Sequence, residues 1–138
     1  MTEQSELLKK FAKNAPATDA AIGALEASTG LSLPPDYRLF LAEANGGEGF
    51  VGESYLMLWR VEDLESINVE YEVAKYLTNV LLIGSSGGGE AYGFDVGRVP
   101  WSVIRVPFIV MEANAQEEIA PTLSDFLELL YTSDELCP

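Results

Sequence analysis

The order of apolar and polar residues over residues 33–47 predicts a helix that lies in the core of the fold. Pro35 suits its first position, because the fixed φ of proline matches a helix and no N–H needs a partner there. Asp36 then places a carboxylate beside the positive end of the helix dipole. The buried stripe at i, i+3, i+4 and i+7 would consist of Tyr37, Phe40, Leu41 and Ala44. Asn45-Gly46-Gly47 ends the helix, since these residues tolerate positive φ. We expect the other elements to pack against this helix.

Two shorter apolar patterns precede it and predict further helices. Residues 3–13 place two leucines and a phenylalanine at helical spacing, and residues 14–16 break this pattern with a proline. Thr18 suits the N-cap of a second helix that ends at Gly30. The N-terminal part is therefore expected to be helical.

Strand-like patterns dominate the region between residues 50 and 111. The expected strands are residues 50–52, 55–59, 80–83, 90–95, 103–106 and 108–111. The apolar run at 80–83 is typical of a central strand buried on both faces. Alternation in the strand 90–95 puts Tyr92 and Phe94 on one face, and the Gly-rich segment 84–89 before it predicts a hairpin turn.

Two more helices complete the predicted fold. Helical periodicity returns from Val61 to about Tyr76. A last helix follows Thr122, which begins a capping-box pattern, and residues 132–138 are expected to be loose. Helices at both ends around mostly antiparallel strands predict one α+β domain over residues 1–138, with N-terminal, mid-chain and C-terminal helices flanking the sheet.

Composition narrows the class of protein. No apolar run is long enough to cross a bilayer, and the polar, acidic N-terminus is unlike a signal peptide. The one cysteine, Cys137, cannot form an internal disulfide, which favours a reducing cytoplasm. We expect a cytoplasmic protein.

Charge is the most unusual property of the chain. It has 22 acidic and 8 basic residues, for a net charge of −14. Such a surface repels nucleic acid and anionic lipid, because both need cationic side chains to bind. It would attract a basic protein partner. The alternative, which stays open, is that the acidity only keeps the protein in solution.

The sequence offers little catalytic chemistry. It has no histidine, which removes the Ser-His-Asp and Cys-His arrangements, and Cys137 lies too close to the chain end to be held as a nucleophile. The glycine turn lacks the Lys-Ser/Thr of a phosphate-binding loop. The carboxylate pairs Glu62/Asp63 and Glu117/Glu118 are adjacent in sequence and so point in different directions. We expect no enzyme, no metal and no cofactor.

Several short motifs together resemble the Smi1/Knr4 family of the SUKH superfamily. The first runs from Leu33-Pro34-x-Asp36-Tyr37 through Phe40-Leu41 to Asn45-Gly46-Gly47. Trp59 with Val61-Glu62-Asp63-Leu64 follows, and then Ile83-Gly84-Ser85-x-Gly87-Gly88-Gly89-Glu90-x-Tyr92-x-Phe94-Asp95. The last is Ala120-x-x-Leu123-x-x-Phe126-Leu127. The resemblance covers about residues 18–131 and rests on the shared order of these motifs.

The resemblance implies an α+β fold with a curved sheet and no established catalytic constellation. Bacterial members are commonly immunity proteins that neutralise a toxin, often a nuclease, and fungal members are scaffold or regulatory proteins. Because a nuclease carries a basic groove, an acidic immunity protein could occupy it. This gives the hypothesis of a cytoplasmic immunity protein that binds a cognate toxin or other basic protein.

The residues expected to contact the partner are acidic side chains and aromatic anchors on and beside the sheet. They are Glu53, Tyr55, Trp59, Glu62, Asp63, Glu70, Glu72, Glu90, Tyr92 and Asp95. For each acidic residue, the alternative is an ordinary solvated side chain without a partner-binding role. For each aromatic residue, the alternative is packing in the core. Two other functions remain open as well: a regulatory scaffold that docks a peptide in the sheet groove, and a small-ligand binder or enzyme with a pocket near Trp59.

Overall fold

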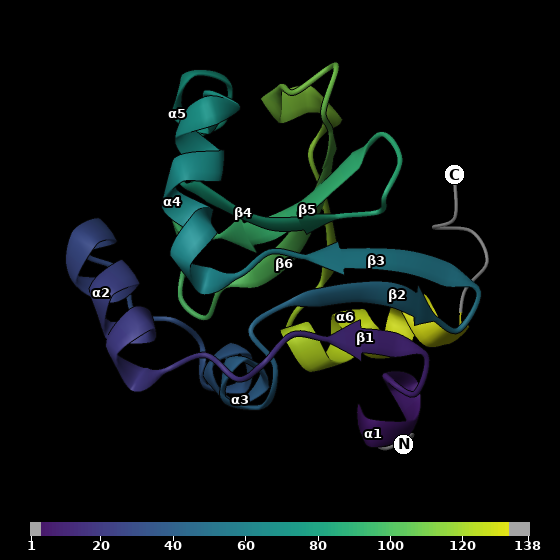
Figure 1. Ribbon diagram of the computed structural model, residues 1–138. Coiled ribbons are helices and arrows are strands. Elements are labelled where there is room, and N and C mark those ends of the chain that lie inside the picture. The colour runs from purple at the N-terminus through teal and green to yellow at the C-terminus, as the bar shows by residue number, and fades with distance from the viewer. Residues whose placement is uncertain (1–3, 133–138) are drawn as a thin grey trace.

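The computed structural model describes residues 4–132 and has the expected α+β architecture. One open, curved antiparallel sheet has the strand order β1-β2-β3-β4-β5-β6-β7, so every strand pairs with its neighbours in the sequence (Figure 1). The strands are β1 Phe11–Lys13, β2 Gly47–Val51, β3 Ser54–Leu58, β4 Val80–Ser85, β5 Glu90–Asp95, β6 Ser102–Pro107 and β7 Glu117–Ala120. The helices are α1 Gln4–Leu7, α2 Asp19–Thr29, α3 Pro35–Glu43, α4 Val61–Glu70, α5 Val73–Tyr76, the 3₁₀ helix η1 Ala113–Ala115 and α6 Leu123–Thr132.

The two faces of the sheet support two apolar cores. In β5, Tyr92 and Phe94 point into the larger core, which also contains the buried stripes of α3 and α6. Ala91 points the opposite way, into a smaller core beneath α5 and the segment that leads to η1. The alternation predicted for residues 90–95 is therefore confirmed, and it explains why one strand can serve both cores.

The predicted central helix is confirmed as α3. Tyr37, Phe40, Leu41 and Ala44 are all buried, the last two completely. Burial also raises the pKa of the Tyr37 phenol. A buried side chain of this size contributes about 1.5–3 kcal/mol relative to its exposed state, so this stripe is a main source of stability.

Helix predictions near the N-terminus have two different outcomes. Thr18 caps α2 by accepting a hydrogen bond from the Ala21 N–H, as its sequence position predicts. The single helix over residues 3–13 is wrong, because residues 11–13 form β1 and pair with β2. Phe11 is buried in this strand and packs on Phe40 with ring centroids 6.4 Å apart. This tertiary pairing overrides the helical periodicity.

The predicted helix over residues 61–76 is interrupted. Helix α4 ends at Glu70, and Glu72 adopts a left-handed conformation at φ 55° before α5 begins. This reversal lets Val73 enter the smaller core, where it is 2% exposed.

The segment after β6 also differs from its prediction. Residues 108–111 form turns and not a strand, and Met111 is buried in the smaller core. The missed strand is β7, which pairs with β6 at the sheet edge. Its sequence, Glu-Glu-Ile-Ala, carries charges toward solvent as edge strands often do, and this hid the strand signal.

Candidate protein-binding surface

A groove of about 500 Å³ lies where the uncovered part of the sheet meets the start of α4. Strand β3 pairs with β4 only at Met57 and Leu58, so β1, β2 and β3 turn away from the rest of the sheet (Figure 1). The chain leaves β3 through Trp59 and Arg60 and enters α4 directly. The lining residues are Ala12, Asn14, Gly47, Glu48, Met57, Leu58, Trp59, Arg60 and Asp63.

The Asn45-Gly46-Gly47 motif lies next to this groove, which Gly47 lines. The Asn45 Oδ1 accepts a hydrogen bond from the Val61 N–H at 2.8 Å, and its Nδ2 donates to Glu62 Oε1 at 2.6 Å. Asn14 Nδ2 in turn donates to the Asn45 carbonyl at 3.0 Å. Gly46 has φ 78°, and a Cβ there would collide with the Leu58 carbonyl oxygen. The motif therefore joins the end of α3 to the beginning of α4 and acts in folding.

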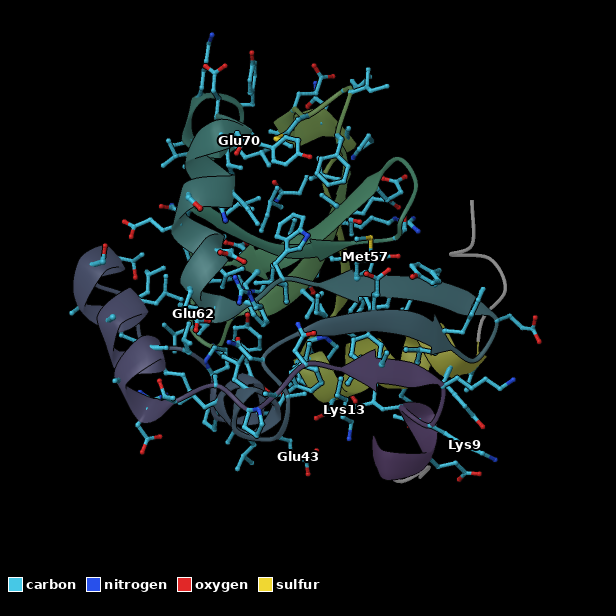
Figure 2. All side chains as sticks on the ribbon, viewed as in Figure 1. Lys9, Lys13, Glu43, Met57, Glu62 and Glu70 are labelled. Carbon is cyan, nitrogen blue, oxygen red and sulfur yellow. The ribbon has the colours of Figure 1, made fainter. Side chains whose placement is uncertain are left out.

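Glu62 is part of this joint. The Asn45 amide and the backbone at the helix start lower the pKa of the Glu62 carboxyl group, because both stabilise its charged form. Glu62 thus stays ionised, and its carboxylate is already hydrogen-bonded at the start of α4. Figure 2 shows it at the opposite end of α4 from Glu70.

Next to the groove, the exposed face of β2 and β3 carries an aromatic pair. Phe50 and Tyr55 pack edge-to-face with centroids 5.2 Å apart. The Tyr55 hydroxyl donates to the Glu48 carboxylate, and this hydrogen bond raises the pKa of the Tyr55 phenol. Glu48, Phe50 and Met57 share this face but were not among the residues expected from the sequence. The alternation of exposed and half-buried residues along 47–51 would have revealed them had the predicted strand been extended back to Gly47.

Basic side chains are mostly neutralised by neighbouring carboxylates. Six of the eight basic residues form ion pairs in the part of the chain that the structure describes. The pairs are Lys13–Glu43, Arg38–Glu26, Arg60–Asp63, Lys75–Glu72, Arg98–Glu118 and Arg105–Glu117. Exposed pairs of this kind add little to stability, about 0–1 kcal/mol each. Their main consequence is that the remaining carboxylates determine the sign of the surface potential.

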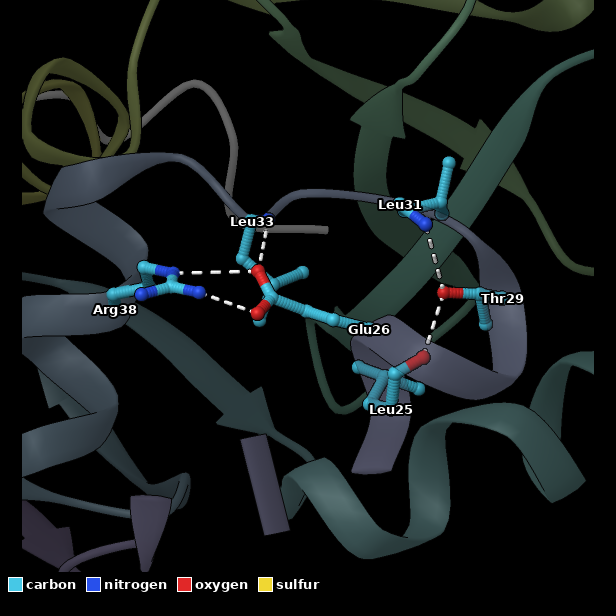
Figure 3. A network of polar contacts seen from close by, with 6 residues as sticks. All are labelled: Leu25, Glu26, Thr29, Leu31, Leu33 and Arg38. Atoms are coloured by element: carbon cyan, nitrogen blue, oxygen red, sulfur yellow. Dashed lines mark hydrogen bonds and ion pairs between the residues drawn. The ribbon is translucent and has the colours of Figure 1, made fainter. Parts of the chain in front are cut away.

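The Arg38–Glu26 pair belongs to a network that ties α2 to α3 (Figure 3). Glu26 accepts a hydrogen bond from the Leu33 N–H at 2.8 Å and two more from the Arg38 guanidinium. The Leu33 N–H has the largest effect on the pKa of the Glu26 carboxyl group and lowers it; burial opposes this with the next largest effect, and the Arg38 guanidinium lowers the pKa further. This carboxylate therefore serves the loop between two helices.

The ten residues expected to contact a partner do not form one surface. Trp59 and Asp63 line the groove, with Tyr55 on the adjacent strand face and Glu62 at the base of α4. Glu53 lies in the β2–β3 turn. Glu70 and Glu72 lie at the far end of α4, and Glu90 and Asp95 lie at opposite ends of β5.

The prediction that Tyr92 contacts a partner is wrong. Its side chain is 0% exposed and packs against Phe126 at 4.8 Å between ring centroids. It is therefore a core residue and offers no surface to a partner. The alternation of β5 already placed it on the same face as Phe94, which is also buried.

Within its described residues, the structure also places those that the sequence analysis considered for metal binding, catalysis and phosphate binding. Residues 4–132 contain no cluster of three His, Cys, Asp or Glu side chains arranged to hold a metal ion. Cys137 lies outside the described residues, so the prediction that it is no nucleophile stays a prediction. The glycine-rich segment forms the β4–β5 hairpin turn, where the Ser86 N–H donates to the Glu90 carbonyl at 3.0 Å. No helix in the described part of the chain is long and apolar enough to cross a membrane.

One curved, open antiparallel sheet flanked by helices, in a chain with a net charge of −14, places this protein among the α+β proteins. The chain belongs to the SMI1/KNR4 family (SUKH-1), whose family model matches residues 16–129. This match nearly coincides with the resemblance over 18–131. No curated protein matches the chain significantly. Membership of the family fits a protein-interaction domain.

Proposed function

We propose that this chain is a non-catalytic protein-binding domain that acts in the cytoplasm as a bacterial immunity protein. In this role it binds a cognate basic toxin, of the nuclease class, and blocks it. The observation that carries the proposal is the charge: the net charge is −14, and within residues 4–132 six of the eight basic residues are already paired with carboxylates.

The physical mechanism follows from what a nuclease must carry. Its substrate is a polyanion, so its active site lies in a groove rich in lysine and arginine. An acidic protein is steered toward that groove and can occupy it as a charge mimic of the nucleic acid. Internal pairing of the cations keeps local positive potential low, so the attraction is not cancelled.

A regulatory or scaffold module is the second candidate, and the groove beside Trp59 favours it. A concave surface of about 500 Å³ with an aromatic wall could hold an extended segment of an endogenous protein. An adjacent gene that ends in a toxin domain would favour immunity over this alternative. A small-ligand binder is the third candidate, and a thermal-shift screen with nucleotides and sugars tests it, because a bound ligand raises the melting temperature.

The direct experiment uses a protein that is encoded by an adjacent gene and ends in a toxin domain. Its C-terminal domain would be purified and mixed with this chain at increasing molar ratios while cleavage of DNA and RNA is measured. The proposal predicts complete inhibition near one equivalent and a complex that co-elutes in size exclusion. Undiminished cleavage in the presence of excess chain would contradict the immunity role.

A further inference from the structure

Exposed apolar side chains gather at one end of the molecule. Five of the eight large hydrophobic residues that are exposed in the described part of the chain lie in two segments there, residues 69–76 and 108–112. Ile109 is 95% exposed and Val69 is 71% exposed. We call this surface the apolar end patch, and it consists of Val69, Tyr71, Tyr76, Ile109 and Val110. Large apolar side chains exposed close together commonly mark a site of protein contact.

The two segments are joined both at the surface and beneath it. The Tyr71 and Phe108 rings lie 4.9 Å apart and link the end of α4 to the segment after β6. Below them, Val73 and Met111 are buried together in the smaller core. Figure 1 shows the end of α4, α5 and η1 side by side at this end of the fold. The patch therefore rests on a packed support.

Three carboxylates lie in the same two segments as the apolar side chains, and we call them the rim of the patch. Glu70, Glu72 and Glu112 lie within or beside the two segments, and Figure 2 shows Glu70 at this end of α4. Lys75 is the one basic residue in these segments, and it already pairs with Glu72 at 3.7 Å. Three carboxylates against one paired lysine leave the rim anionic.

The charge of the rim decides between two occupants. A second copy of this chain would bring its own Glu70, Glu72 and Glu112 against the same residues, and like charges across an interface are unfavourable. A partner with an apolar centre and a lysine- or arginine-rich rim complements both features. Tyrosines at the centre of such a contact supply large, rigid area at low entropic cost.

We infer that the apolar end patch, and not the groove beside Trp59, is the surface on which a basic protein partner docks. The inference rests on the proposed function for the charge of that partner and adds where it binds. Glu70 and Glu72 would then steer the partner, while Tyr71 and Ile109 are covered on binding.

The test uses a defined probe: a synthetic amphipathic helix of leucine and lysine, which carries an apolar face between basic rims. It would be titrated into the full ¹⁵N-labelled chain while backbone amide shifts are followed by NMR. The largest shifts are expected in residues 69–76 and 108–112. Shifts centred on the groove beside Trp59 (residues 12–14 and 57–63), on a separate pocket that residues 30–35 and 99–101 line, or on no region at all would overturn the inference.

Matched surface variants distinguish the patch from general stickiness. Val69→Ser and Ile109→Ser should each weaken peptide binding about three- to tenfold. Leu39→Ser and Val99→Ser are the controls, because these side chains are 72% and 92% exposed and lie outside the patch. Equal loss in the controls would contradict the inference, and so would a concentration-dependent dimer that Ile109→Ser abolishes. Failure here leaves toxin inhibition, measured separately, to judge the proposed function.

Discussion

The Asp36 carboxylate on α3 accepts a hydrogen bond from the Ser124 backbone N–H on α6 at 3.0 Å. The Ser124 hydroxyl lies 3.4 Å from the same oxygen. Asp36 therefore satisfies an N-terminal amide of a helix 88 residues later in the chain. These two helices, which both pack into the larger core, are thus fixed to each other at their N-terminal ends.

Replacing Asp36 by alanine should lower the free energy of unfolding by about 1 kcal/mol, because α6 loses a capping acceptor. Asp36→Asn keeps an acceptor oxygen without the charge and should cost less. Urea denaturation of the three proteins measures the difference. Equal stability of the alanine variant and the parent would show that the contact contributes nothing.

Asn45→Ala should be more damaging, because it leaves the buried Val61 N–H without its acceptor. Asn45 is 5% exposed, and the loss of a buried hydrogen-bonding group costs about 1–3 kcal/mol. Asn114→Ala, at an exposed position of η1, is the control and should be nearly neutral. Thermal or urea unfolding gives both values, and similar stabilities would contradict the assigned role of Asn45.

Two glycine-to-alanine changes should have opposite signs. Gly23 lies inside α2 and has open space where a Cβ would stand, so Gly23→Ala should stabilise the protein by about 0.5–1 kcal/mol. Gly46→Ala should destabilise it by at least about 1–2 kcal/mol, because Gly46 has φ 78° and touches the β3 backbone. Melting temperatures that move in the same direction would contradict this account.

Glu26 should contribute a pH-dependent part of the stability. Its pKa in the folded state is lowered by the Leu33 N–H and Arg38, so the contribution is present above the ordinary glutamate pKa of about 4.3. It is then lost as pH falls through the lower pKa of the folded state. Glu26→Gln should be less stable than the parent at neutral pH, and the difference should shrink in acid. Parallel stability curves against pH would rule this out.

Much of the fold could be predicted because its signals are local. The stripe of α3, the cap of α2 and the alternation of β5 each depend on a few neighbouring residues. Strand β1 could not be predicted, since Phe11 joins a sheet whose other strands lie far along the chain. The break at Glu72 depends in the same way on the distant segment that packs on Tyr71.

The candidate surface was harder to predict than the fold. A sequence shows which residues are acidic, but it does not show which of them already form hydrogen bonds or ion pairs within the fold. Glu62 accepts a hydrogen bond from Asn45, and Asp63 forms an ion pair with Arg60. Segments 69–76 and 108–112 are separated by more than thirty residues and meet only through tertiary packing. Tyr92, by contrast, could have been assigned to the core from the alternation that it shares with Phe94.

The central claim is that an anionic surface steers this chain onto a basic protein. The most direct measurement is the association rate with the catalytically inactivated product of the adjacent gene at ionic strengths from low to high, by stopped-flow or surface plasmon resonance. The account predicts a steep fall in the association rate, of about tenfold or more, with a smaller change in the dissociation rate. Glu70→Lys combined with Glu72→Lys should reduce both the rate at low salt and its salt dependence. An association rate that stays flat across the salt series would contradict the account.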